Sequence, residues 1–235
     1  MKKILLLLVI SGLIFSGHAV YAQGTKELSG AWQNVKDAGE TICIMDDYLV
    51  YAKFDIGAKT FGHTWGGPIT LDGNTLVVMV EFDSNDKSAV GQKKQLTIRQ
   101  TDLLAVEGLG ATLFLKQVDK GIGALAGNWR ITARKQSETM GEIPLRPRRT
   151  LKLLTGERFQ WMAINTETGE FFGTGGGRYT FKDGKYTEQI EFFSRDGNRV
   201  GVSLSFDGKV EQGQWHHSGL SSKGEPIYET WGRMQ

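Results

Sequence analysis

The chain has 235 residues, a formal net charge of +2 and 40% hydrophobic residues, enough for one large or two small domains with sizeable cores. A near-neutral chain is a poor candidate for nucleic-acid binding, which relies on clustered Lys and Arg to neutralise phosphates. Cys43 is the single cysteine, so no internal disulfide can form and the cores must hold by packing alone.

Residues 1–22 have the pattern of a signal peptide. Lys2 and Lys3 precede an apolar run at residues 4–15, and Val20 and Ala22 occupy the −3 and −1 positions of a cleavage site. The run is too short to span a bilayer, which needs about 20 apolar residues. We therefore expect an exported protein, periplasmic or secreted, without a membrane span. Removal of Lys2 and Lys3 leaves equal numbers of basic and acidic side chains.

The rest of the chain has the composition of an all-β protein. It holds 31 glycines against 4 prolines, and turn signals such as Asp183-Gly184 and Asp207-Gly208 recur at intervals of about ten residues. After residue 22 no segment shows sustained helical periodicity. We expect antiparallel strands and little helix.

An internal repeat organises these strands. The segment Leu-Ser-Gly-Ala-Trp at 28–32 recurs as Leu-Ala-Gly-Asn-Trp at 125–129, and residues 80–86 match residues 190–196 at an offset of 110. A repeat of this length indicates two homologous domains or two halves of one fold. We predict two tandem antiparallel up-and-down barrels, at 23–121 and 122–235, because each copy offers about eight strands, enough to close a small barrel.

The second copy contains an insertion. Its Thr150-Leu151 matches Thr41-Ile42 at an offset of 109, whereas the Gly-x-Trp segments are 97 positions apart, so about a dozen residues are added between them. The insertion lies roughly between residues 134 and 149, where Pro144 and Pro147 exclude regular strand.

Alternating hydrophobicity assigns the strand faces of the second copy. Phe159 and Trp161 share one side, while Arg158 and Gln160 point to water. The same rule places some polar side chains among apolar ones, as at Glu188, His217 and Glu229. The candidate ligand-binding residues are Trp161, Tyr179, Glu188, Phe192, Trp215, His217, Glu229 and Trp231.

Two interpretations of the inward carboxylates remain open, because an unpaired buried charge costs several kcal/mol. In the first, Glu188 or Glu229 pairs with Arg233 in a structural network. In the second, these groups lie at the base or mouth of a cavity and orient a ligand with one polar end. The first copy has Val78 where Glu188 would be, so any binding site is predicted in the second barrel.

Two motifs are better explained by structure than by chemistry. The glycine run at 173–177 continues into a strand, which predicts a bulge or a barrel corner and not a phosphate-binding loop. His216 and His217 face opposite sides of one strand and have no third ligand nearby in the sequence, so no metal site is predicted. We assign no cofactor and no catalytic residue.

The insertion carries a basic cluster, Arg146, Arg148 and Arg149. These side chains either clamp a carboxylate or phosphate over the barrel mouth or form a solvated loop that keeps the protein soluble.

The Gly-x-Trp on the first strand, about eight antiparallel strands and a basic residue on the last strand resemble lipocalins and related calycin barrels. The resemblance implies that Trp32 and Trp129 close the barrel floors. It also implies that Arg233 packs across Trp129, with Lys116 as the weaker counterpart for Trp32. The second half is also similar to secreted lipocalin-like proteins of Bacteroides-type bacteria, a family of unknown function. The second lipocalin motif, of the Thr-Asp-Tyr type, is missing.

These observations predict an exported binding module that holds a small, largely apolar molecule in its second barrel, with the first barrel as a scaffold. One alternative is an envelope-associated interaction module with filled barrels and no ligand. Another is an enzyme that uses Glu188, His217 and Glu229 as acid and base groups.

Overall fold

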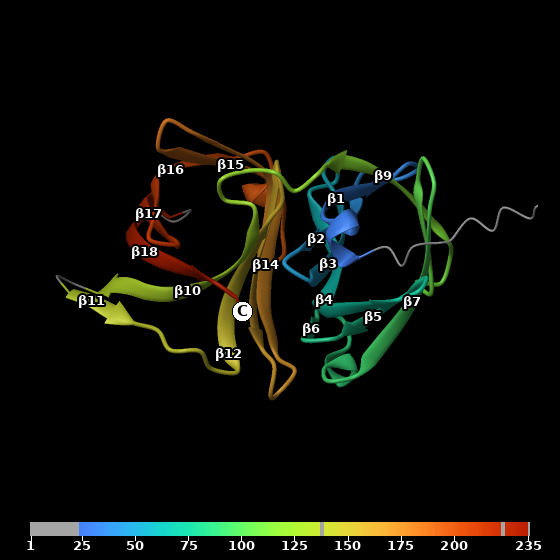
Figure 1. The fold of residues 1–235 in the computed structure, drawn as a ribbon. Helices are drawn as coiled ribbons and strands as arrows, with labels where there is room; N and C mark the ends of the chain where they lie inside the picture. The colour runs from blue at the N-terminus through green and yellow to red at the C-terminus, as the bar shows by residue number, and fades with distance from the viewer. Residues whose placement is uncertain (1–23, 137–138, 222–223, 235) are drawn as a thin grey trace, which may run out of the picture.

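The computed structural model describes residues 24–136, 139–221 and 224–234, so the predicted signal peptide lies outside the described residues. These residues form two nine-stranded antiparallel sheets, and each sheet closes into an eight-stranded barrel. The two barrels lie side by side (Figure 1). The predicted all-β fold with two tandem barrels is confirmed.

The first barrel is closed by pairing between its third and fourth strands, β3 and β4, while the short β6 is added at the side of β4. Its strands are β1 (Gly30–Asn34), β2 (Glu40–Met45), β3 (Tyr48–Asp55), β4 (Thr60–Asp72), β5 (Thr75–Met79), β6 (Phe82–Asp83), β7 (Lys93–Gln100), β8 (Leu104–Glu107) and β9 (Leu113–Asp119). Two short 3-10 helices accompany them, η1 (Thr25–Leu28) and η2 (Lys87–Ala89).

The second barrel is closed by pairing between its first and last strands, β10 and β18. Its strands are β10 (Gly127–Gln136), β11 (Thr139–Glu142), β12 (Arg148–Leu154), β13 (Arg158–Asn165), β14 (Phe171–Lys182), β15 (Lys185–Phe193), β16 (Ser203–Glu211), β17 (Gln214–Leu220) and β18 (Pro226–Arg233). The 3-10 helix η3 (Gly197–Arg199) precedes β16.

Two local expectations are corrected, on the insertion and on Asp207-Gly208, and the turn expected at Asp183-Gly184 is confirmed. The insertion is not free of strand, because β10 runs on to Gln136 and pairs with β11 before Pro144. Asp183-Gly184 forms the β14–β15 turn with both residues at positive φ, as a primed hairpin turn requires. Asp207-Gly208 lies inside β16, where a turn was expected.

The repeated Leu-x-Gly-x-Trp segment closes one end of each barrel. The indole Nε1 of Trp129 donates a hydrogen bond of 2.8 Å to the carbonyl of Leu125, and Trp32 repeats this bond to Leu28. Both leucines are fully buried. Gly127 has a φ of 147°, and a Cβ there would lie 1.3 Å from Nη1 of Arg233. Only glycine therefore fits at position 127.

Arg233 completes the closed end of the second barrel. Its guanidinium carbon lies 4.0 Å from the centroid of the Trp129 ring. Nη1 donates to the carbonyl of Ala126 at 2.5 Å and lies 3.4 Å from a carboxylate oxygen of Asp46, which belongs to the first barrel.

The first barrel lacks this arrangement. A register shift between Ala31 and Trp32 places Gln117 opposite Trp32, so Lys116 pairs with Gln33 and is exposed. The Gln117 amide donates to the carbonyl of Ser29 at 3.0 Å. The counterpart expected at Lys116 is wrong, because the bulge moves each residue of β9 by one position.

The strand ladders also correct the alignment of the two copies. Trp32 pairs with Ile42, and Trp129 pairs with Lys152, so Lys152 corresponds to Ile42. The sequence match of Thr41-Ile42 with Thr150-Leu151 is one residue out of register.

Apolar residues on the outer faces of the barrels form a shared core between them. Cys43, Met45 and Val50 of the first barrel belong to one buried cluster with residues of β12 and β13. Its members from the second barrel include Leu151, Leu153, Met162 and Ile164. Burial here raises the pKa of the Cys43 thiol to about 12. Strands β12 and β13 are therefore buried on both faces.

Polar contacts join the same surfaces. The amide of Gln160 donates to Oγ1 of Thr64 at 2.8 Å, and Arg149 pairs with Glu81 at 2.8 Å. Gln160 is 4% exposed and Arg158 is 5% exposed. The prediction that both point to water is wrong, because the first barrel covers this face.

We expect Arg233→Ala to lower the free energy of unfolding by about 1–3 kcal/mol, since it removes the cation–π contact with Trp129 and the bond to Ala126. Urea denaturation measures this change. Lys116→Ala removes the exposed basic residue of the first barrel and is the control, with an expected change within about 0.5 kcal/mol. Equal effects of the two substitutions would contradict the role of Arg233 in closure.

Candidate functional site

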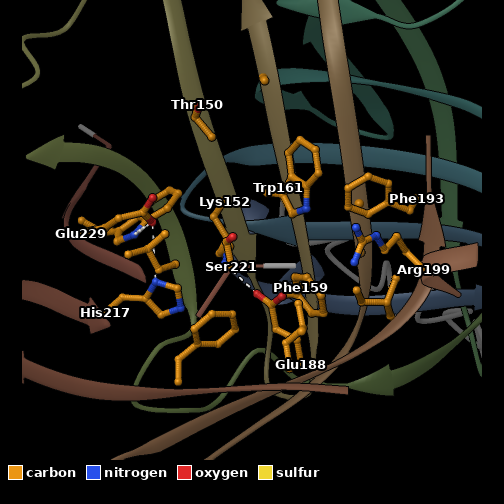
Figure 2. Close-up of a pocket in the computed structure, with 18 of the residues that line it drawn as sticks. Thr150, Lys152, Phe159, Trp161, Glu188, Phe193, Arg199, His217, Ser221 and Glu229 are labelled. Atoms are coloured by element: carbon orange, nitrogen blue, oxygen red, sulfur yellow. Dashed lines mark hydrogen bonds and ion pairs between the residues drawn. The ribbon is translucent and has the colours of Figure 1, made fainter. Parts of the chain in front are cut away.

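A cavity of about 820 Å³ occupies the second barrel (Figure 2). Five of the eight predicted ligand-binding residues line it. They are Trp161, Glu188, His217, Glu229 and Trp231. Strands β13, β15, β17 and β18 position these side chains, and the predicted inward face of Phe159 and Trp161 also lines the cavity.

The other three predicted residues lie elsewhere. The hydroxyl of Tyr179 donates to the carbonyl of Thr155 at 2.7 Å, and Trp215 packs edge-on against Trp129 in the floor. Phe192 leaves the barrel interior and stacks on Phe54 of the first barrel, with 4.5 Å between ring centroids.

A β-bulge explains the position of Phe192. Gly177 pairs with Ile190 and Gly176 pairs with Phe192, so Glu191 is left without a partner in the ladder. The extra residue reverses the alternation of faces. Phe193 therefore lines the cavity in place of Phe192 and packs against Trp161. The predicted bulge in the glycine run is present.

The second barrel is hollow because a glycine replaces a tryptophan. The ladders place Tyr51 opposite Trp65 in the first barrel and Trp161 opposite Gly175 in the second. Trp65 is 1% exposed and belongs to the core that fills the first barrel. A Cβ on Gly175 would lie 2.7 Å from the indole nitrogen of Trp161. Gly175 therefore leaves room for the Trp161 ring, which lines the cavity, where the first copy has the buried Trp65 ring.

The second barrel also exchanges four apolar residues for polar ones. Its buried Lys152, Glu188, His217 and Glu229 line the cavity. The ladders align them with residues of the first barrel's apolar core. In the same order, those residues are Ile42, Val78, Val106 and Leu113.

Lys152 and Glu188 form a buried ion pair on one wall of the cavity. Nζ lies 2.7 Å from Oε1, and the side chains are 6% and 7% exposed. The hydroxyl of Tyr186 donates to the same carboxylate oxygen at 2.9 Å. Burial and the neighbouring Glu188 raise the pKa of Tyr186 well above its usual value, so this hydroxyl keeps its proton.

Four aromatic rings surround the ammonium group of Lys152. Its Nζ lies 5.2–5.6 Å from the ring centroids of Phe159, Tyr186, Trp215 and Trp231. Cation–π attraction and the Glu188 carboxylate together offset the cost of removing this charge from water.

Glu229 on β18 forms a second charged group in the cavity lining, on the same side as His217 (Figure 2). Its Oε1 accepts hydrogen bonds from Nη2 and Nε of Arg134, at 2.6 and 3.1 Å, and its Oε2 accepts one from Trp231 at 3.1 Å. Burial by itself raises the pKa of this carboxyl, but His217 and Arg134 outweigh burial and lower it to about 2. Glu229 is therefore ionised at neutral pH.

His217 brings two unsatisfied polar atoms into the cavity lining. It is 3% exposed, and neither ring nitrogen has a hydrogen-bond partner among the described residues. Nδ1 lies 3.6 Å from Oε2 of Glu229, beyond hydrogen-bonding distance. Burial lowers the pKa of His217, so the neutral ring offers a ligand one donor and one acceptor.

Neither Glu188 nor Glu229 pairs with Arg233, the partner considered for a structural network. Glu188 binds Lys152 and Glu229 binds Arg134, while Arg233 lies at the closed end. The pairing with Arg233 is therefore wrong. Sequence reasoning did not identify Lys152, which stands between Leu151 and Leu153 on β12. The apolar residues on both sides of Lys152 were a signal of a strand buried on both faces.

His216, the neighbour of His217 in the sequence, lies apart from the cavity. Nδ1 of His216 is 3.4 Å from Oγ1 of Thr230, and His216 does not line the cavity. Within residues 24–136, 139–221 and 224–234, no three His, Cys, Asp or Glu side chains are grouped as a metal site requires.

Two closed eight-stranded antiparallel barrels in tandem fit a lipocalin-like, calycin-type fold. Residues 124–235, which include all strands of the second barrel, match a family described as "Domain of unknown function (DUF4488)". A search of curated proteins finds no match to the chain. Among the residues that the structure describes, no helix is long and apolar enough to cross a membrane.

The first barrel suggests a direct test of the buried ion pair. We expect Lys152→Ile to destabilise the protein by about 3–5 kcal/mol, because it leaves the Glu188 charge buried without its partner. The double substitution Lys152→Ile and Glu188→Val installs the residues of the first barrel and should recover part of this loss, because the charge is gone and only the Tyr186 hydroxyl loses its acceptor. Urea denaturation compares the two variants. A double variant as unstable as the single one would contradict this account of the pair.

Glu229→Gln should weaken the dependence of stability on pH in acid. In the folded protein the carboxyl keeps its charge down to about pH 2, whereas its unperturbed pKa is 4.5. The unfolded chain therefore binds more protons between these values, and stability that is present above pH 4.5 is lost as the pH falls.

Urea denaturation at about pH 3 and about pH 6 measures this dependence. Glu225→Gln, at an exposed carboxylate, is the control for the loss of one charge. An unchanged pH dependence in Glu229→Gln would contradict the assigned pKa.

Proposed function

We propose that the protein is exported and that its second barrel binds a small, largely apolar molecule with a polar end. The hollow interior carries this proposal, because a cavity of about 820 Å³ occupies the second barrel, whereas Trp65 and aliphatic side chains fill the first. Binding sites for small molecules have similar volumes and are lined by aromatic side chains with a few convergent polar groups. The signal-peptide pattern of residues 1–22 supports export.

The chemistry of the lining supports an orienting role for its polar groups. Trp161, Phe193 and Trp231 supply apolar surface, whereas His217 supplies buried donor and acceptor atoms without partners. Buried polar atoms are rarely left unsatisfied, so a ligand hydroxyl, carbonyl or similar group completes this site.

The first barrel acts as a scaffold in this proposal. Its equivalent interior positions are apolar and filled, and its outer face covers β12 and β13, which carry Lys152 and Trp161. Packing of this face holds one wall of the cavity in position.

We expect the double substitution Trp161→Tyr and Gly175→Trp to abolish binding. It installs the Tyr51 and Trp65 pair, whose rings stack at 5.8 Å in the first barrel, and therefore places a large ring inside the cavity that His217 and the aromatic side chains line. Titration with the neutral fluorophore N-phenyl-1-naphthylamine measures binding in the native protein and in the variant.

The control is Val210→Trp, which adds a ring at an exposed position of β16, away from the cavity lining. It should bind the fluorophore as the native protein does. Circular dichroism verifies that both variants are folded. Undiminished binding by a folded cavity-filled variant would contradict the proposed site, as would native mass spectrometry of protein from its host that shows no ligand and no binding on lipid addition.

A further inference from the structure

A second, smaller cavity adjoins the first on the side away from the Trp129 floor. It has a volume of about 280 Å³ and shares Arg134, Thr150, Ala163 and Arg195 with the main cavity. We call it the mouth pocket, and its other lining residues are Ile131, Ile143, Arg148, Arg149 and Phe172. Because they share these four residues, the two cavities are adjacent.

The mouth pocket is strongly basic. Four arginines line it, and no acidic side chain does. Two of them have carboxylate partners: Arg134 binds Glu229, and Arg149 binds Glu81. Even so, Nε of Arg149 is buried without a hydrogen-bond partner among the described residues.

The other two arginines are held by uncharged groups of one residue. The guanidinium of Arg148 lies 4.6 Å from the centroid of the Phe172 ring, and that of Arg195 donates to the Phe172 carbonyl. Neither has a carboxylate partner within residues 24–136, 139–221 and 224–234. Phe172 therefore positions two positive charges that the described part of the chain leaves uncompensated.

Two uncompensated guanidinium groups suit a dianion better than a carboxylate. A phosphate monoester carries a charge of about −1.5 to −2 at neutral pH and offers three acceptor oxygens. Guanidinium groups bind such oxygens through paired, charge-assisted hydrogen bonds. The charge and the donor groups of the pocket match this headgroup.

We propose that the mouth pocket binds the phosphate monoester headgroup of an amphiphile whose apolar part occupies the main cavity. The inference rests on the proposed function, since the main cavity must accept the apolar part. It adds the chemical class of the polar end and assigns its recognition to Arg148 and Arg195. Of the three arginines in the basic cluster of the insertion, Arg148 and Arg149 line the pocket and Arg146 does not.

Isothermal titration with three probes tests the headgroup and its source. The probes are dodecyl phosphate below its micelle-forming concentration, 1-dodecanol below its solubility limit, and inorganic phosphate. We expect dodecyl phosphate to bind at least about tenfold more tightly than 1-dodecanol, a ratio that charge-assisted hydrogen bonds supply. Inorganic phosphate should bind far more weakly than dodecyl phosphate because it lacks the apolar part.

The variant Arg148→Gln with Arg195→Gln separates this pocket from the main cavity. Dodecyl phosphate should lose at least about tenfold in affinity, while 1-dodecanol binds as before and so shows that the barrel is intact. The matched control is Arg146→Gln, which removes one exposed guanidinium from the same insertion and should leave both affinities unchanged.

Several results would overturn the inference. Equal affinities for dodecyl phosphate and 1-dodecanol, or an equal loss in Arg146→Gln, would remove the headgroup site and leave the proposed function standing. Inorganic phosphate that binds as tightly as dodecyl phosphate would reject the amphiphile. Failure of every probe to bind, together with failure of N-phenyl-1-naphthylamine, would remove the proposed function itself.

Discussion

The hydrogen bond from each tryptophan indole to the leucine carbonyl four residues earlier is the constraint on which both barrels depend. It turns the chain at the start of the first strand, so that the leucine closes one end and the tryptophan enters the interior. Glycine at the centre of the segment is required because the backbone has a positive φ and the opposite strand approaches closely. The closed end thus places the first interior residue of each barrel.

From this shared closure the two interiors diverge. In the first, Trp65 and aliphatic side chains fill the space. In the second, Gly175 leaves the space open, and a lysine, a histidine and two glutamates replace aliphatic residues on the walls. Such groups weaken a core unless each charge is paired. Here Glu188 and Arg134 supply the pairs, and His217 is left with unsatisfied nitrogens in the cavity.

The candidate site was partly predictable. Glu188, His217 and Glu229 stand on otherwise apolar faces, so alternation alone placed them in the interior. Phe192 does not follow the rule, because a bulge at Glu191 reverses the faces. Lys152 was missed because leucines flank it on a strand whose outer face is covered by the first barrel. A single alternation pattern cannot distinguish solvent from a neighbouring domain.

The sequence by itself determined the all-β class, the two tandem copies and the closing segments, because these depend on local periodicity, turn residues and a repeated motif. Tertiary structure decided the rest. It set the registers within each barrel, since irregularities at Trp32 and Glu191 shift the ladders by one residue. It also decided which charges meet, since Lys152 and Glu188 lie far apart in the chain and become neighbours only when β12 and β15 enclose one interior. Pairing across a closed barrel depends on the whole ring of strands, and short-range sequence patterns do not contain it.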